Sequence, residues 1–237
     1  MKILHILPTR VARAAENMAI DFLLLQRYPE STLPRFRHYA WHTQAFTFGY
    51  SQKYAWVIEQ LPKEETFDVC RRPTGGGIVD HRQDWTFSLV IPRGHPLEEI
   101  RATQSYREIH KCLIQALVKQ GIKAKLQAAE DTQPAEGITG VCFRRAEVFD
   151  VVMSDTGEKI AGAAQKRSKH GLLFQGSLSR QVIGDSIDWD LFHEDFTTNL
   201  GILLGAPAQQ TPWPEFNEDE LSGLIEQYSS SDWLAFR

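Results

Sequence analysis

Arg71-Arg72-Pro73-Thr74-Gly75-Gly76-Gly77-Ile78-Val79-Asp80-His81 is the stretch of this sequence that constrains the molecule most. Three consecutive glycines cost backbone entropy on folding, so such a run needs a structural or functional reason. A ligand can lie directly against main-chain N–H groups there, between the polar groups of two arginines and a histidine. The alternative is a run that serves only an unusual backbone path. The spacing is neither GxGxxG nor GxxxxGK[ST], which excludes a dinucleotide fingerprint and a Walker loop.

Composition restricts the class of protein. The chain has 237 residues, 42% of them hydrophobic, which suffices for one substantial core. We expect one catalytic domain over residues 1–237, with about 206–237 as a C-terminal helical extension. The net charge of −4 argues against nucleic-acid binding, and no apolar run approaches the roughly 18 residues of a membrane span. The three cysteines contain no CxxC pair, which indicates a cytoplasmic protein without a metal site.

Hydrophobic periodicity predicts an α+β fold. Helices are expected at 11–28, 51–61, 98–119, 189–204 and 217–229. Strands are expected at 1–8 (in place of a signal peptide), 37–41, 45–49, 68–71, 85–91, 148–153, 159–165 and 172–178. Residues 128–140 are expected to form a loop. Because the strands alternate irregularly with the helices, we expect a mixed, largely antiparallel central sheet with flanking helices rather than a doubly wound one.

Four further segments accompany the glycine run. They are residues 16–21 (ENMAID), Trp41 followed by 49–52 (GYSQ), 141–143 (VCF) and 158–165 (EKIAGAAQ). In this order they resemble the lipoate-protein ligase A and octanoyltransferase family, whose catalytic fold is shared with biotin protein ligases. The resemblance covers about residues 10–205. It implies a cleft in which the glycine loop and the KIAG strand enclose a medium-length acyl chain.

The resemblance also implies roles for individual residues. Cys142 and Lys159 are expected to be catalytic. Residues expected to bind substrate are Arg71, Arg72, Thr74, Gly75, Gly76, Gly77, His81, Gly162 and Ala163. The ammonium of Lys159 would stabilise an oxyanion or lower the pKa of a thiol, although a lone lysine is usually a solvated surface residue. His81 is expected to shape the site, and a purely structural histidine is the alternative.

The region around Cys142 bears on the chemistry. Ligases of this family activate lipoate with ATP through an acyl-adenylate, and many carry a GRND-type segment and an extra C-terminal domain. This chain has Gly140-Val141-Cys142-Phe143 instead, and too few residues after 205 for that domain. The Cys-Phe pair resembles the cysteine octanoyltransferases, in which the thiol forms an acyl thioester. A thiol needs a nearby cation to react quickly at neutral pH, and Lys159 is the first candidate, ahead of Arg144 and Arg145.

We therefore expect an acyltransferase that moves an octanoyl or lipoyl group from acyl carrier protein to a lysine of a lipoyl domain or a glycine cleavage H protein. That reaction needs no cofactor, because the donor thioester is already activated. One alternative is a lipoate-protein ligase that uses ATP and Mg²⁺. Another is a non-catalytic acyl-binding homologue.

Some positions depart from the family pattern or have a simpler interpretation. His42 follows the strand tryptophan where proline is frequent, and Gln175 stands where histidine is frequent. These differences leave the acyl and acceptor specificity open. Cys70 and Cys112 are expected in the core, and a small buried hydrophobe is the alternative for Cys142.

Overall fold

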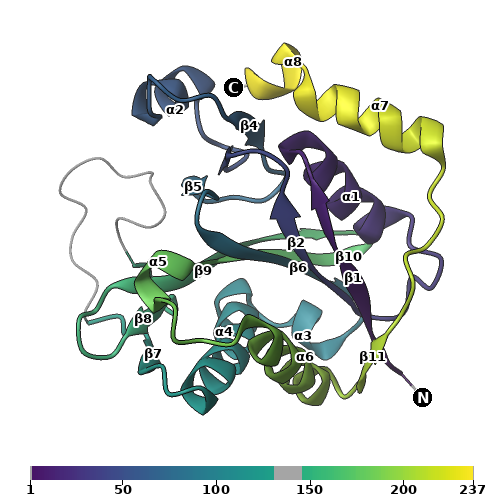
Figure 1. Ribbon diagram of the computed structural model, residues 1–237. Coiled ribbons are helices and arrows are strands. Elements are labelled where there is room, and N and C mark those ends of the chain that lie inside the picture. Colours follow the sequence, from purple (N-terminus) through teal and green to yellow (C-terminus); the bar gives the residue numbers. More distant parts are fainter. Residues whose placement is uncertain (1, 131–145, 237) are drawn as a thin grey trace.

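The computed structural model describes residues 2–130 and 146–236 (Figure 1). Its central sheet has eight strands in the order β11-β1-β2-β6-β10-β9-β8-β7. In that order they span Ala208–Gln210, Leu4–Ala12, Arg35–Trp41, Asp84–Pro92, Gly171–Ser179, Lys159–Ser168, Val151–Met153 and Ala124–Leu126. Strand β1 pairs in parallel with β11 and β2, and the other neighbours are antiparallel. The expected α+β fold with a mixed, largely antiparallel sheet is confirmed.

A small second sheet holds the glycine run. Its strands are β4 (Asp68–Arg71), β3 (Ala45–Phe48) and β5 (Ile78–Asp80), in that order. Strand β3 is parallel to β4 and antiparallel to β5. Because β4 ends at Arg71 and β5 begins at Ile78, the glycine run is the connection between the two outer strands of this sheet.

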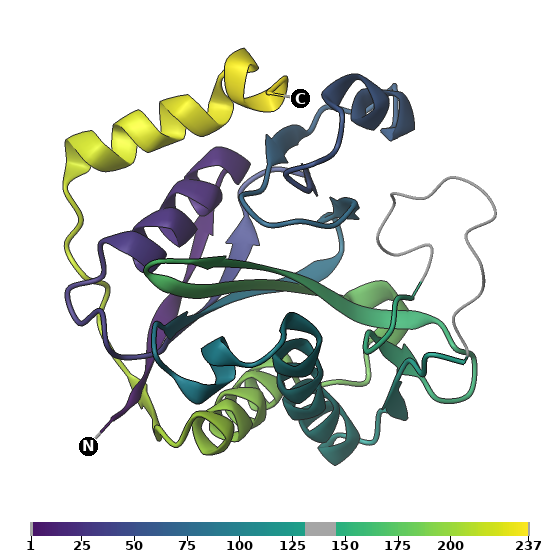
Figure 2. The same cartoon turned by 180° about the vertical axis from the view of Figure 1, so that it is seen from behind.

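Helices cover both faces of the central sheet (Figures 1 and 2). On one side lie α1 (Ala14–Gln26) and, outside it, α7 (Glu218–Ser229), followed by α8 (Ser231–Leu234). On the other side lie α3 (Pro96–Glu99), α4 (Ala102–Lys119) and α6 (Trp189–Leu204). The short helices α2 (Tyr54–Gln60) and α5 (Arg180–Ile183) lie at the periphery. Among the described residues, none of the helices combines the length and the apolar composition that a membrane span requires.

The core explains why these segments form these elements. Alternate residues of β6, Phe87, Leu89 and Ile91, are fully buried in the main cluster together with the inner face of α4, as expected for a strand's apolar face. The other face of the sheet packs on α1, whose residues Ile20 and Leu24 cluster with Val90 of β6, while Met18 and Leu23 are buried in a cluster that includes residues of α7. Cys70 and Cys112 are also buried, which confirms the prediction for both.

Several predicted boundaries are wrong: the helix predicted at 11–28 begins only at Ala14, and the strand predicted at 148–153 begins only at Val151. The first strand continues past Pro8 to Ala12, because a shift in its register with β2 between Leu7 and Arg10 accommodates a proline that lacks an N–H donor. The helix predicted at 98–119 divides into α3 and α4, because Ile100 is extended and Arg101 forms a new N-cap. The helix predicted at 51–61 begins only at Tyr54. The three-residue strands β5, β7 and β11 were not predicted, since they are too short to show a period.

Candidate active site

The glycine run lies against the start of the loop that follows β3. A Cβ atom on Gly49 would lie 2.0 Å from the carbonyl oxygen of Gly76, so glycine is required at position 49. Gly76 has a φ of 89°, a conformation that other residues rarely adopt. A Cβ on Gly75, in contrast, would meet no atom within 4 Å. An added side chain at Gly75 would therefore extend into open space.

The side chain of Arg72 stabilises this loop through hydrogen bonds to its backbone. Its guanidinium donates to the carbonyl oxygens of Gly75 and Gly77 at 2.9 and 3.0 Å and to the hydroxyl of Thr47 at 2.7 Å. The side chain is almost fully buried. Three charge-assisted hydrogen bonds from one planar group fix the shape of the loop.

Thr74 ties the loop to the central sheet. Its hydroxyl donates to Oε1 of Gln175 at 2.7 Å, and Nε2 of Gln175 donates to Asp21 at 2.7 Å. Asp21 forms a fully buried ion pair with Arg37. Gln175, which departs from the family pattern, thus joins the loop to a buried charge pair between α1 and β2.

His81 lies in a polar network at the end of β5. Its Nδ1 is 2.6 Å from the carboxylate of Asp84, and its Nε2 is 2.6 Å from the hydroxyl of Thr47. Since a carboxylate only accepts, Nδ1 donates to Asp84 and Nε2 accepts from Thr47. The ring also stacks on Trp41 with the ring centroids 4.1 Å apart. Both ring nitrogens are occupied, an arrangement that suits the site-shaping role predicted for His81.

Lys159, the first residue of β9, is buried rather than solvated. Its Nζ is 2.7 Å from Oδ2 of Asp150, and the exposed fractions of the two side chains are 6% and 1%. A Cβ on Gly162 would lie 2.7 Å from Nζ, so the bare backbone of Gly162 makes room for the ammonium. The interpretation of Lys159 as a solvated surface lysine is wrong.

Tyr106 of α4 completes this arrangement. Its hydroxyl donates to Oδ1 of Asp150 and accepts a hydrogen bond from the backbone N–H of Ala163 at 2.9 Å. The side chain of Ala163 packs on the main core, and its neighbour Ala164 is paired with Gln175 in β10. Because side chains alternate along a strand, Ala164 rather than Ala163 faces the glycine loop.

The sequence contained weak signals for these additional residues. Asp150 is an acidic residue directly before an apolar strand, where a buried charge requires a partner. Tyr106 lies on the apolar face of the helix expected at 98–119, and periodicity does not distinguish a core tyrosine from one that positions a carboxylate.

Cys142, Arg144 and Arg145 lie outside the described residues. Of the other predicted site residues, the structure brings Arg72, Thr74 and His81 together around the glycine loop, and Lys159 beside Gly162. Ser177 of β10 connects these two groups. It is paired with Gly162 of β9, and its hydroxyl donates at 2.5 Å to Asp84, the carboxylate that also binds His81. Arg71 is also buried, and it donates to main-chain carbonyls of the loop after β3 and of α8.

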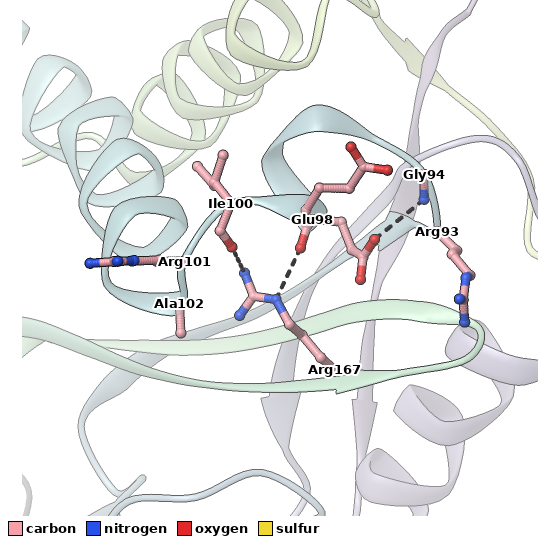
Figure 3. Close-up of a pocket in the computed structure, with 8 residues that line it drawn as sticks. Arg93, Gly94, Glu98, Ile100, Arg101, Ala102 and Arg167 are labelled. Carbon is pink, nitrogen blue, oxygen red and sulfur yellow. Dashed lines mark hydrogen bonds between the residues drawn. The ribbon is translucent and has the colours of Figure 1, made fainter.

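A hollow of about 570 Å³ lies elsewhere, where α3 and α4 meet the end of β9 (Figure 3). Its lining includes Arg93, Glu98, Arg101 and Arg167, and none of the predicted site residues. The guanidinium of Arg167 donates to the carbonyl oxygens of Glu98 and Ile100, so it stabilises the corner between the two helices. In the described part of the chain, no group of three or more His, Cys, Asp or Glu residues is arranged to hold a metal ion.

His110 supports the conformation that presents Asp150. Its Nδ1 donates to the carbonyl oxygen of Phe149 at 2.7 Å, and Phe149 has a positive φ of 70°. Burial lowers the pKa of His110 from 6.5 to about 4, so the ring is neutral in the folded protein at neutral pH.

We expect this histidine to make the protein sensitive to acid. Because the pKa of His110 is lower in the folded state than in the unfolded state, its contribution to stability is complete above about pH 6.5 and is lost as the pH falls towards 4. The loss amounts to at most about 3 kcal/mol. Urea unfolding of the wild type and of His110→Gln between pH 7 and pH 4 checks this, because the variant should show a smaller decrease. Equal slopes for both proteins would contradict the assignment.

Comparisons with known proteins show the family to which the chain belongs. Residues 13–193 match the family model described as the lipoyl protein ligase A/B catalytic domain. Octanoyltransferase LipM of Macrococcus caseolyticus is 28% identical over 93% of this chain and 94% of its own length. Octanoyltransferase LipM of Bacillus cereus is 32% identical over 75% of this chain, and the match spans 65% of that relative.

Solved structures agree on the fold. The bipartite lipoate-protein ligase of Thermoplasma acidophilum superimposes with a TM-score of 0.74 at 17% identity, over 100% of this chain and 98% of that one. A lipoate-protein ligase A bound with ATP gives a TM-score of 0.73 at 17% identity, over 99% of each chain.

Proposed function

The chain belongs to the lipoyl protein ligase A/B catalytic domain family, and we propose that it is an octanoyltransferase of protein lipoylation that works through a thioester on Cys142. The donor is an octanoyl (or lipoyl) thioester of acyl carrier protein, and the acceptor is a lysine of a lipoyl domain or of a glycine cleavage H protein. The observation that carries the proposal is the buried Lys159–Asp150 pair beside Gly162, in the strand that characterises the family.

The proposed reaction has two steps. The Cys142 thiolate attacks the carbonyl carbon of the donor thioester, and the carrier thiol leaves and takes up a proton. The acceptor amine then attacks the enzyme thioester, an amide forms, and Cys142 leaves as a thiol. Both steps pass through a tetrahedral intermediate with a negatively charged oxygen, and in this proposal the Lys159 ammonium stabilises that charge.

The described residues support the acyl-binding part of this proposal. Gly75 presents bare backbone to open space, while Arg72 and Thr74 hold the loop rigidly. A preformed surface of this kind accommodates an acyl chain without loss of backbone entropy on binding. The cytoplasmic location belongs to the same proposal and is supported by the buried, unpaired thiols of Cys70 and Cys112.

Intact mass spectrometry tests the proposal against its alternatives. After the protein is mixed with octanoyl carrier protein, the expected result is a mass increase of one octanoyl group, located on Cys142 by peptide mapping and discharged by a lipoyl domain. Formation of an acyl-adenylate from free lipoate, ATP and Mg²⁺, without the adduct, would favour the ligase alternative. Retention of octanoate with neither product would favour the non-catalytic homologue.

The groove wall is tested by a valine at position 75. Gly75→Val should lower octanoyl transfer by roughly 10²-fold, because a branched side chain would occupy the space of the acyl chain or its carbonyl end. Transfer of a butanoyl group should be retained, and the melting temperature should stay at the wild-type value. Rates for both acyl groups check this.

Gly76→Val is the matched control. At a φ of 89° a valine is strained, so this variant should lose stability and activity towards both acyl groups together. If Gly75→Val transfers octanoyl groups at the wild-type rate, the glycine run does not line the acyl site.

A further inference from the structure

Arg71 of the glycine motif was expected to bind substrate, but its guanidinium donates to main-chain carbonyl oxygens of the protein itself. Its side chain is fully buried. Nη1 donates to the carbonyl oxygens of Tyr50 and Gln52 at 2.5 and 2.9 Å. Nε and Nη2 donate to the carbonyl oxygens of Trp233 and Leu234 at 3.0 and 2.6 Å. One guanidinium therefore joins the loop after β3 to the last turn of α8.

The connection is reciprocal. The indole Nε1 of Trp233 donates to the backbone carbonyl of Arg71 at 2.9 Å, so α8 holds both the side chain and the main chain of this residue. The thiol of Cys70 donates to the carbonyl of Tyr228 at 3.6 Å, and the ring of Tyr228 packs at 5.1 Å from that of Trp233. The end of β4 is thus attached to the C-terminal helices directly before the glycine run begins.

The loop on the other side of Arg71 contacts the glycine run itself. The backbone N–H of Tyr50 donates to the carbonyl oxygen of Thr74 at 2.8 Å, and the side-chain Nε2 of Gln52 donates to the carbonyl oxygen of Gly76 at 3.3 Å. The N–H of Arg72 donates to the carbonyl of Phe48 at 2.8 Å. A displacement of residues 50–52 would therefore move the glycine run.

We propose that α7 and α8 stabilise the glycine run, the proposed acyl-binding loop, in the conformation that binds the acyl chain. Arg71 is the positioning residue that connects these helices to the loop. These helices lie outside the region 13–193 that matches the family model, so the part of the chain that holds the motif residue Arg71 is not part of that model. The part that concerns acyl binding rests on the proposed function. The structural connection does not depend on it.

The test uses two tryptophan-to-phenylalanine variants. Trp233→Phe removes the hydrogen bond to Arg71 and keeps an aromatic ring. Trp213→Phe is the matched control, since it removes a comparable indole hydrogen bond to Pro8, remote from the glycine run. Arg71→Lys keeps the charge but cannot donate to four carbonyls, and provides a second, stronger perturbation.

Hydrogen exchange in the free protein is the first measurement. Trp233→Phe should raise the exchange rates of the Tyr50 and Arg72 amides by about fivefold, the effect of losing one hydrogen bond of ~1 kcal/mol. Protection within α1 and α4 should stay at the wild-type level, and Trp213→Phe should exchange like the wild type at Tyr50 and Arg72. Unchanged exchange at these two amides in both Trp233→Phe and Arg71→Lys would overturn the proposal.

Kinetics is the second measurement. We expect Trp233→Phe and Arg71→Lys to raise the KM for octanoyl carrier protein with a smaller effect on kcat, because the acyl-binding loop is affected and the Lys159–Asp150 pair is not. An equal loss of both parameters that follows the melting temperature would reduce Arg71 to a purely structural residue. If the wild type transfers no octanoyl group, the proposed function fails, while the exchange measurement still decides on the connection.

Discussion

Replacement of Cys142 by alanine is expected to abolish octanoyl transfer from carrier protein to a lipoyl domain. If the acyl group passes through a thioester on this sulfur, the reaction stops in the variant, because the methyl group of alanine cannot form a thioester. The remaining rate should be lower by at least about 10⁴-fold, comparable to the loss of a nucleophile in other covalent mechanisms. The measurement is the steady-state rate, together with the mass of the protein after incubation with the donor.

The control for this experiment is the fold. Cys142→Ala should keep the wild-type melting temperature, and Cys112→Ala is a matched cysteine variant whose thiol is buried in the core. That variant should lose some stability and keep the wild-type mass adduct. Transfer by Cys142→Ala at the wild-type rate would show that Cys142 is not the nucleophile.

Replacement of Lys159 by methionine is expected to lower the transfer rate by about 10²–10³-fold, the effect of removing one oxyanion donor. Methionine retains much of the volume that the side chain fills beside Gly162. The variant also leaves the carboxylate of Asp150 buried without its ammonium partner. If Cys142 lies beside this pair, as the proposed reaction requires, the uncompensated negative charge should raise the pKa of its thiol, so alkylation of Cys142 should require a higher pH than in the wild type.

Asp150→Asn supplies the opposite perturbation. It keeps the shape of the side chain and removes the negative charge that compensates Lys159. The uncompensated ammonium should lower the pKa of Cys142, so the pH profile of alkylation should shift in the direction opposite to that of Lys159→Met. Profiles that do not move in either variant would show that the pair does not act on the thiol.

The fold followed from the sequence wherever a segment was long and periodic. The apolar strand at 85–91 and the helix at 189–204 were recognised because they bury one face against the core over several residues. The division of the long helix at Ile100 and the continuation of the first strand past Pro8 were not. Both depend on neighbouring elements, since Arg167 of β9 binds the corner at Ile100 and β2 accommodates the irregular register of β1.

The site shows the same division. The order of the motifs, from the glycine run to the KIAG strand, identified the family and pointed to Arg72, Thr74 and His81, which lie around the glycine loop. The sequence did not reveal that Lys159 is paired with Asp150, that a side chain at Gly75 would extend into open space, or that Gly76 has a positive φ. A partner for a buried charge is found across strands and helices, and local spacing does not encode it.

Arg71 shows what only the tertiary structure decided. Its place beside Arg72 in the motif suggested that both bind substrate. In the folded chain Arg72 binds the glycine carbonyls, whereas Arg71 binds the carbonyls of α8, more than 160 positions away along the sequence. The sequence by itself determined the family, the sheet and the chemical groups of the site, because these depend on periodicity and residue type. The hydrogen-bond and ion-pair partners of these groups depended on the tertiary structure, because a buried polar atom bonds to whichever group the fold places within reach.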